Sequence, residues 1–164
     1  MSGNGLARRD LVAIAVAGGA ALLLFLSFVL DWVALDAPER PIGLGIDAVP
    51  TWGTAYVIAV MQLVALFVGV MTLPLAIGRA ARVLGIGWAV GVGAIVTPAV
   101  LRLSDGDWIV ANVPTAVLLS SHESAPPGWR AGLYCAISAL VLMIAAFALA
   151  RAPLRDIEES PTAA

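Results

Sequence analysis

Charged and chemically reactive side chains are scarce in this sequence. Its 164 residues include no lysine, one cysteine and one histidine, and only 12% are charged, whereas an ordinary soluble domain has about 25% charged residues. The single histidine, His122, and the single cysteine, Cys135, exclude paired zinc ligands of these types, a CxxC redox motif and a disulfide within the chain. So few charges cannot cover a surface that faces water on all sides.

The motifs of common enzyme classes are missing as well. No Walker A loop, GxSxG elbow or GxGxxG turn occurs in a polar segment. His122 and Glu123 are adjacent, but no third ligand or positioned nucleophile accompanies them, and we interpret the pair as solvated loop residues. We therefore predict no catalytic, cofactor-binding or metal-binding residues, no cofactor, no enzymatic activity and no nucleic-acid partner.

Apolar residues make up 61% of the chain and are gathered into four long runs. A helix rises about 1.5 Å per residue and the hydrocarbon core of a bilayer is about 30 Å thick, so a span needs about 20 largely apolar residues. The runs that meet this requirement, with no charge in their interiors, are 11–30, 55–77, 83–101 and 131–150. This pattern predicts an all-α membrane protein, with residues 1–164 forming a single membrane domain and the four transmembrane helices an up-down-up-down bundle.

The arginines are distributed unequally between the two sides of this predicted bundle. The six on one side are Arg8, Arg9, Arg79, Arg82, Arg151 and Arg155, and the three on the other are Arg40, Arg102 and Arg130. Positively charged segments are retained in the cytoplasm. We therefore expect cytoplasmic N- and C-termini in the plasma (inner) membrane, a cytoplasmic tail at 151–164, outer loops at 31–54 and 102–130, and a tight inner turn that contains Arg79 and Arg82.

Aromatic residues cluster near the predicted outer ends of the spans. Trp and Tyr favour membrane interfaces, where an apolar ring can keep its polar edge hydrated. We therefore interpret Trp32, Trp52, Trp129 and Tyr134 as interface anchors. Trp88 lies nearer the inner end, and packing or interfacial anchoring explains it better than a role in stacking on a ligand.

The two outer loops differ in character. The first is interrupted by proline and glycine, so any regular structure in it should be short. The second contains apolar stretches at 108–110 and 115–119, which are too short to span a membrane. A strand pair and a shallow interfacial helix would both bury these stretches, and periodicity does not separate the two over so few residues.

Polar and small residues inside the spans indicate packing rather than transport. Gln62 is the only carboxamide in a span, and a lone glutamine more often forms a hydrogen bond between helices than a permeation site. Small residues that permit close helix approach in the third span are Gly85, Gly87, Gly91 and Gly93. We expect these glycines to pack within the bundle, with contact between subunits as the alternative. Pro74 is expected to cause a local kink near the inner end of the second span.

Short sequence features resemble those of the uncharacterised small four-helix integral membrane proteins of high-GC Gram-positive (actinobacterial) bacteria. The points of similarity are the Phe-Val-Leu-Asp-Trp ending of the first span at 28–32, Trp52, the segment 102–106, Trp129 and the acidic tail at 156–159. Many of those proteins have proline where this chain has Asp31. The resemblance implies a membrane location and no known activity, and it assigns no functional residues.

Two classes of function remain after these exclusions. The preferred one is a non-enzymatic accessory or assembly subunit that packs in the bilayer against other membrane proteins or further copies of itself. The alternative is a small transporter or channel that acts as a homo-oligomer. Charged groups within the spans would have favoured transport, and the four spans contain none.

Overall fold

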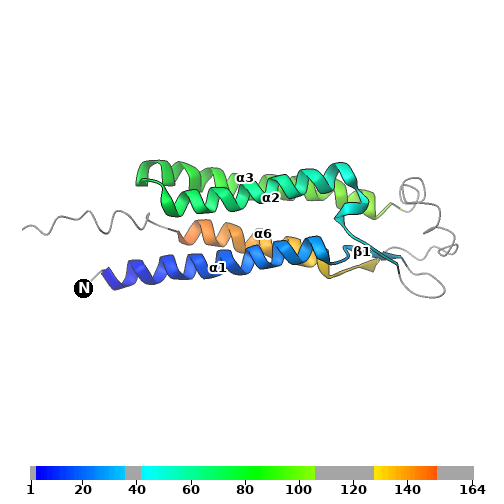
Figure 1. The fold of residues 1–164 in the computed structure, drawn as a ribbon, viewed down its shortest axis with the longest axis horizontal. Coiled ribbons are helices and arrows are strands. Elements are labelled where there is room, and N and C mark those ends of the chain that lie inside the picture. Colours follow the sequence, from blue (N-terminus) through cyan, green and yellow to red (C-terminus); the bar gives the residue numbers. More distant parts are fainter. Residues whose placement is uncertain (1–2, 36–41, 106–127, 151–164) are drawn as a thin grey trace, which may run out of the picture.

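Four long helices form most of the chain in a computed structural model that describes residues 3–35, 42–105 and 128–150. They are α1 (Gly3–Val29), α2 (Pro50–Thr72), α3 (Leu75–Leu103) and α6 (Ala131–Leu149) (Figure 1). Each contains a stretch of 19 to 27 residues that is long and apolar enough to cross a membrane. The prediction of a mostly helical chain with four candidate spans is therefore confirmed.

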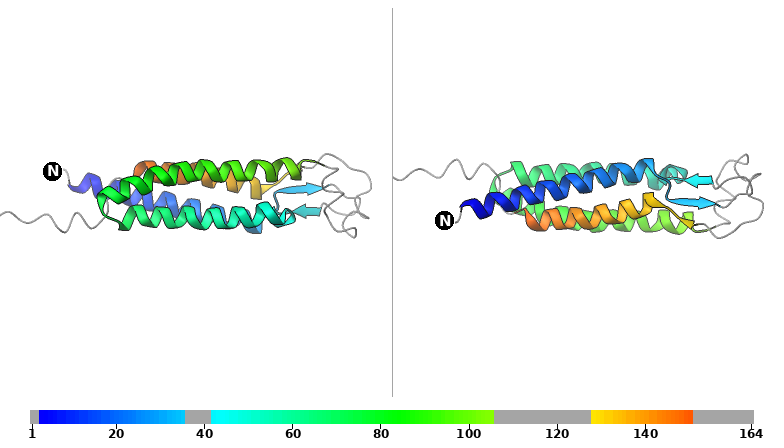
Figure 2. Two further views of the ribbon diagram at one scale, coloured as in Figure 1. Left: turned by 90° about the horizontal axis from the view of Figure 1, so that it is seen from above. Right: turned by 90° about the horizontal axis from the view of Figure 1, so that it is seen from below.

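The helices pack as two pairs. The α1–α6 pair and the α2–α3 pair each have an extensive interface, and α3 and α6 join the two pairs. Figure 2 shows the pairs from opposite sides of the bundle. The face of α1 that packs inward carries small residues at helical spacing, including Ala13, Ala17 and Ala20, all of which are buried. Alanines on α6, such as Ala136 and Ala139, are also fully buried, so these two backbones can approach closely.

A small sheet covers one end of the bundle. Its three antiparallel strands are β1 (Val33–Leu35), β2 (Ile42–Leu44) and β3 (Gly128–Trp129), in the spatial order β2-β1-β3. A short 3-10 helix, η1 (Ile46–Ala48), then leads into α2. We call the end of the bundle that carries the sheet the sheet end. The opposite end, where Leu73 and Pro74 connect α2 to α3, is called the turn end.

Regular structure in the described residues of the first loop, outside α2, is short, as predicted. No strand of the sheet exceeds three residues. The apolar stretches 108–110 and 115–119 of the second loop lie outside the described residues, but β3 at the end of that loop pairs with β1. The two loops are therefore joined by backbone pairing, which ties the start of α6 to the end of α1.

The predicted position of the turn between the second and third spans is wrong. α2 ends at Thr72, and Pro74 is the N-cap of α3. Proline disfavours a helical conformation in the residue before it, and Leu73 is accordingly extended, with φ −87° and ψ 155°. The apolar run continues across this break, which is why hydropathy alone put the turn near Arg79 and Arg82.

Both of these arginines lie instead in the first turns of α3. Arg79 is exposed, and the guanidinium of Arg82 donates a hydrogen bond of 2.8 Å to the carbonyl oxygen of Ala148. Ala148 lies in the last turn of α6, where carbonyl groups have no partner within the helix. A cation at this position also interacts favourably with the helix dipole. Arg82 therefore caps α6 and fixes it to α3.

Candidate functional site

The backbone that follows α1 holds the sheet end together. The Trp32 amide donates to the carbonyl of Leu44 at 2.9 Å, and the Trp32 carbonyl accepts from the Arg130 amide at 2.8 Å. The Gly132 amide donates to the Asp31 carbonyl at 2.9 Å. Two residues therefore connect the end of α1 to β2 on one side and to the start of α6 on the other.

A buried polar network supports this junction from below. The side chains of Ser27, Trp32 and Tyr56 are all completely buried. The Trp32 indole N–H donates to the Ser27 carbonyl at 2.7 Å, and the Ser27 hydroxyl donates to the Leu24 carbonyl at 2.6 Å. Because that hydroxyl has only one proton to give, the 2.9 Å contact between Ser27 and Tyr56 is donated by the tyrosine. The carbonyl of Ser27 in the last turn of α1 thus has a side-chain partner.

Aromatic packing adds to the network. The rings of Trp32 and Tyr56 meet edge to face at 5.5 Å between centroids, and those of Phe28 and Tyr56 are tilted at 5.2 Å. Such pairs contribute about 0.5–1.5 kcal/mol beyond the area that they bury. The hydrogen bonds and ring contacts of this network therefore hold the junction between α1, the sheet and α6 in a defined position.

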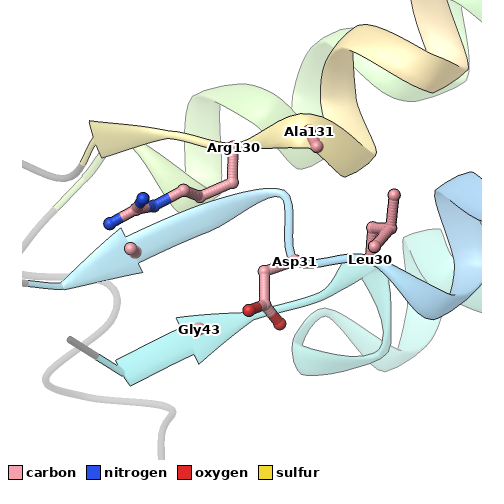
Figure 3. Close-up of a pocket in the computed structure, with 6 residues that line it drawn as sticks. Leu30, Asp31, Gly43, Arg130 and Ala131 are labelled. Atoms are coloured by element: carbon pink, nitrogen blue, oxygen red, sulfur yellow. The ribbon is translucent and has the colours of Figure 1, made fainter. Parts of the chain in front are cut away.

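Above the network lies a shallow cavity of about 290 Å³. Its lining includes Asp31 of the junction, Gly43 of β2 and Arg130, which directly precedes α6 (Figure 3). The Asp31 carboxylate lies directly over Gly43, where an added Cβ would overlap it. Figure 3 shows the Arg130 side chain extending along β1 and away from that carboxylate.

The cavity lining presents one exposed acidic residue and one exposed basic residue on the sheet end. Neither Asp31 nor Arg130 forms an ion pair within the part of the chain that the structure describes, and both are exposed. Such groups can accept and donate hydrogen bonds to a partner of complementary charge. The described residues hold no group of three or more His, Cys, Asp or Glu side chains that could bind a metal ion.

A second hollow lies on the side of the bundle, between α2 and α3. This α2–α3 groove has a volume of about 420 Å³ and is lined mainly by apolar and small residues, with Gln62 at one point of its rim. The Trp88 indole N–H donates to the Ala59 carbonyl at 2.9 Å and so bridges the two helices. Gln62 is exposed and forms no hydrogen bond with any residue that the structure describes.

The predicted interface anchors lie in different surroundings. Trp32 is completely buried within the protein, so it is a packing residue rather than an anchor. Trp52 is partly buried against the core. Trp129 and Tyr134 remain 39% and 58% exposed near the sheet end, and their anchoring stays a prediction.

The glycines predicted to pack fall into two groups. A Cβ at Gly85 would overlap the ring of Phe147 on α6, so this glycine lies where two helices touch. At Gly87, Gly91 and Gly93 an added Cβ would meet no atom within 4 Å. The expected packing of these three within the bundle therefore has no partner among the described residues, and contact between subunits remains the open alternative.

Sequence reasoning did not identify the contact of the Asp31 carboxylate with Gly43 or the position of Arg130 in the same cavity lining. The usable signal was a tryptophan directly after a predicted span, together with a glycine-rich stretch, but their pairing depends on contacts between distant segments. No known protein family, curated protein or solved structure matches the chain. The resemblance to small actinobacterial membrane proteins therefore stays a prediction.

Proposed function

We propose that the chain is a non-enzymatic accessory or assembly subunit of the plasma membrane that binds a partner protein through its sheet end. In this proposal the four helices cross the bilayer in up-down-up-down order, both termini are cytoplasmic and the sheet end faces outward. The exposed pair Asp31 and Arg130, held on a rigid junction, is the observation that carries the proposal.

The interior of the bundle supports this function over transport. Among the described residues the buried side chains with polar groups, apart from the hydrogen-bonded Trp32 and Tyr56, are Asp10 and Ser27. Ser27 is already engaged by Leu24 and Tyr56, and Asp10 lies near the turn end. Ions and protons need a series of groups that replace their hydration shells. The centre of a single copy offers no such series within the described residues.

Co-purification tests the proposal. The tagged protein is extracted from its native membrane in a mild detergent, and stoichiometric partners are identified by mass spectrometry. The double variant Asp31→Asn with Arg130→Gln should reduce recovery of the partner at least tenfold, because paired charges at an interface contribute about 1.5 kcal/mol or more. Asp47→Asn, which removes an exposed acid of the sheet end outside the cavity lining, is the matched control and should leave recovery unchanged.

Two results would count against the proposal. Equal recovery with the double variant would show that the Asp31–Arg130 surface does not bind the partner. A homo-oligomer without another protein would favour the transporter or channel, and ion flux into liposomes would then be measured directly.

A further inference from the structure

Gln62 is in an unusual position for a carboxamide. It lies eleven residues after Thr51 and ten residues before Thr72, the two ends of the candidate span in α2. In a membrane this places it close to the bilayer midplane. Its side chain is exposed on the outside of the bundle rather than directed into it, and no described residue satisfies it.

An unsatisfied carboxamide at this depth is costly. Transfer of an amide from water to a hydrocarbon without a hydrogen bond costs about 4–8 kcal/mol of free energy, and lipid tails offer neither donor nor acceptor. Trp88 is the other residue of the groove lining with a polar side-chain group, and its indole N–H already donates to the Ala59 carbonyl. Lipid headgroups lie at the two membrane surfaces, about 15 Å from the midplane. A partner for Gln62 must therefore be a polar group of another protein chain at the same depth.

The surface around Gln62 is shaped for a helix to approach. Ala65 and Gly69, which follow on the same face of α2 and line the α2–α3 groove, have small-xxx-small spacing. A Cβ added at Gly69 would meet only the end of Leu73, at 3.4 Å. Small residues on an exposed face allow backbones to come close, which strengthens dispersion contacts between helices in a membrane.

We propose that two copies of the chain form a two-fold symmetric dimer through the α2–α3 groove, with their Gln62 carboxamides hydrogen-bonded to each other. A carboxamide carries both donors and acceptors, so it is complementary to a second carboxamide. A two-fold axis along the membrane normal brings identical residues together at identical depth. A second copy thus supplies the missing partner with no further component, whereas an acyl chain would fill the groove and leave the amide unsatisfied.

Dilution in liposomes tests the hydrogen bond. The dimer fraction is measured by energy transfer between labelled copies as the ratio of protein to lipid is lowered. Gln62→Leu should raise the dissociation constant about 3- to 30-fold, the range for one to two hydrogen bonds between helices, and Gln62→Asn should retain most of the affinity. Thr97→Val is the control, because it also removes an exposed polar group from a span. The Thr97 hydroxyl already donates to the Gly93 carbonyl of its own helix, so this change should leave the dissociation constant unchanged.

Cross-linking tests the face that is buried. In a Cys135→Ala background, Ala65→Cys lies on the groove side of α2, whereas Val68→Cys points about 120° away from Gln62 around the helix and is 53% exposed. Mild oxidation in membranes should link the Ala65→Cys copies and leave the Val68→Cys copies monomeric.

Three results would overturn the dimer. They are a monomer at every dilution, equal cross-linking at the two positions, and an unchanged dissociation constant for Gln62→Leu. The proposal is independent of the partner at the sheet end, because neither Asp31 nor Arg130 lines the α2–α3 groove. A variant that abolishes the dimer therefore still allows partner binding at the sheet end to be measured, and a variant that abolishes partner binding still allows the dimer to be measured.

Discussion

At the scale of single residues, Gly85 marks the place where three helices meet. It faces the ring of Phe147, which is completely buried on α6. That ring in turn packs edge to face on Phe67 of α2, with 5.5 Å between centroids. Phe147 is therefore in contact with both α3 and α2, and a shift of its ring would disturb its packing on Phe67.

The first prediction compares two glycines of α3. Gly85→Ala should lower the free energy of unfolding by about 1–3 kcal/mol, because an added methyl group forces a buried ring out of place. Gly87→Ala puts the same methyl group into open space and should not destabilise the protein, since alanine favours a helix over glycine. Titration with SDS in mixed micelles, followed by circular dichroism, measures both.

A compensating change provides the control. Phe147→Leu replaces the ring by a smaller side chain, and in that background Gly85→Ala should cost less than it does alone, because contacting residues are coupled. Equal destabilisation by the two glycine variants would mean that Gly85 and Phe147 do not touch.

At the scale of elements, the sheet depends on pairing between distant segments. Val33 of β1 lies opposite Leu44 of β2 on one side and Trp129 of β3 on the other. Short strands gain little stability from their own sequence. The buried network of Ser27, Trp32 and Tyr56 therefore stabilises the sheet end more than strand propensity does.

The second prediction tests the pairing of β1 with β3. Ala34 is opposite Gly128, and an added Cβ at Gly128 would meet no atom within 4 Å. With Cys135 replaced by alanine, the pair Ala34→Cys and Gly128→Cys should form a disulfide under mild oxidation, because directly paired residues lie within its reach. Maleimide labelling measures the disulfide, because both thiols should react only after a reductant is added.

The matched control shifts one cysteine by a single residue. Successive side chains of a strand point to opposite faces, so Ala34→Cys with Trp129→Cys should not form the bond. Efficient disulfide formation in the shifted pair, or none in the aligned pair, would contradict the register of the sheet.

The helices could be predicted from sequence, and the sheet could not, for a physical reason. An apolar run of about 20 residues is sufficient evidence for a span, because the bilayer requires that length. The strands Val33–Leu35 and Gly128–Trp129 are three and two residues long and lie more than 90 positions apart, so no local period indicates their pairing. At Pro74 the sequence predicted a kink within the second span and not the break between α2 and α3, because apolar residues continue on both sides of it.

The candidate sites were only partly predictable for the same reason. Gln62 could be singled out as the one carboxamide in a span, but its outward direction depends on how α2 packs. The positions of Asp31 and Arg130 beside Gly43 depend on the sheet, which joins three separate parts of the chain.

At the scale of the whole molecule, charge is distributed along the bundle axis. Arg82 lies 21 residues before Leu103, which is about 31 Å along α3 and matches the thickness of the hydrocarbon core. Arg79 lies nearly one turn further toward the turn end and is exposed. Of the arginines in the described residues, Arg8, Arg9, Arg79 and Arg82 lie toward the turn end, whereas Arg102 and Arg130 lie at the sheet end. This excess of arginine favours a turn end in the cytoplasm and a sheet end outside.

The third prediction follows from this asymmetry and is tested with single cysteines in a Cys135→Ala background. Asp47→Cys, at the exposed η1 of the sheet end, should react with a membrane-impermeant maleimide on intact cells. Arg79→Cys, exposed at the turn end, should react only after the membrane is permeabilised. The reverse pattern would place the sheet end in the cytoplasm. The sheet-end surface would then face cytoplasmic partners, whereas a Gln62-paired dimer would be unaffected, because the midplane is the same from either side.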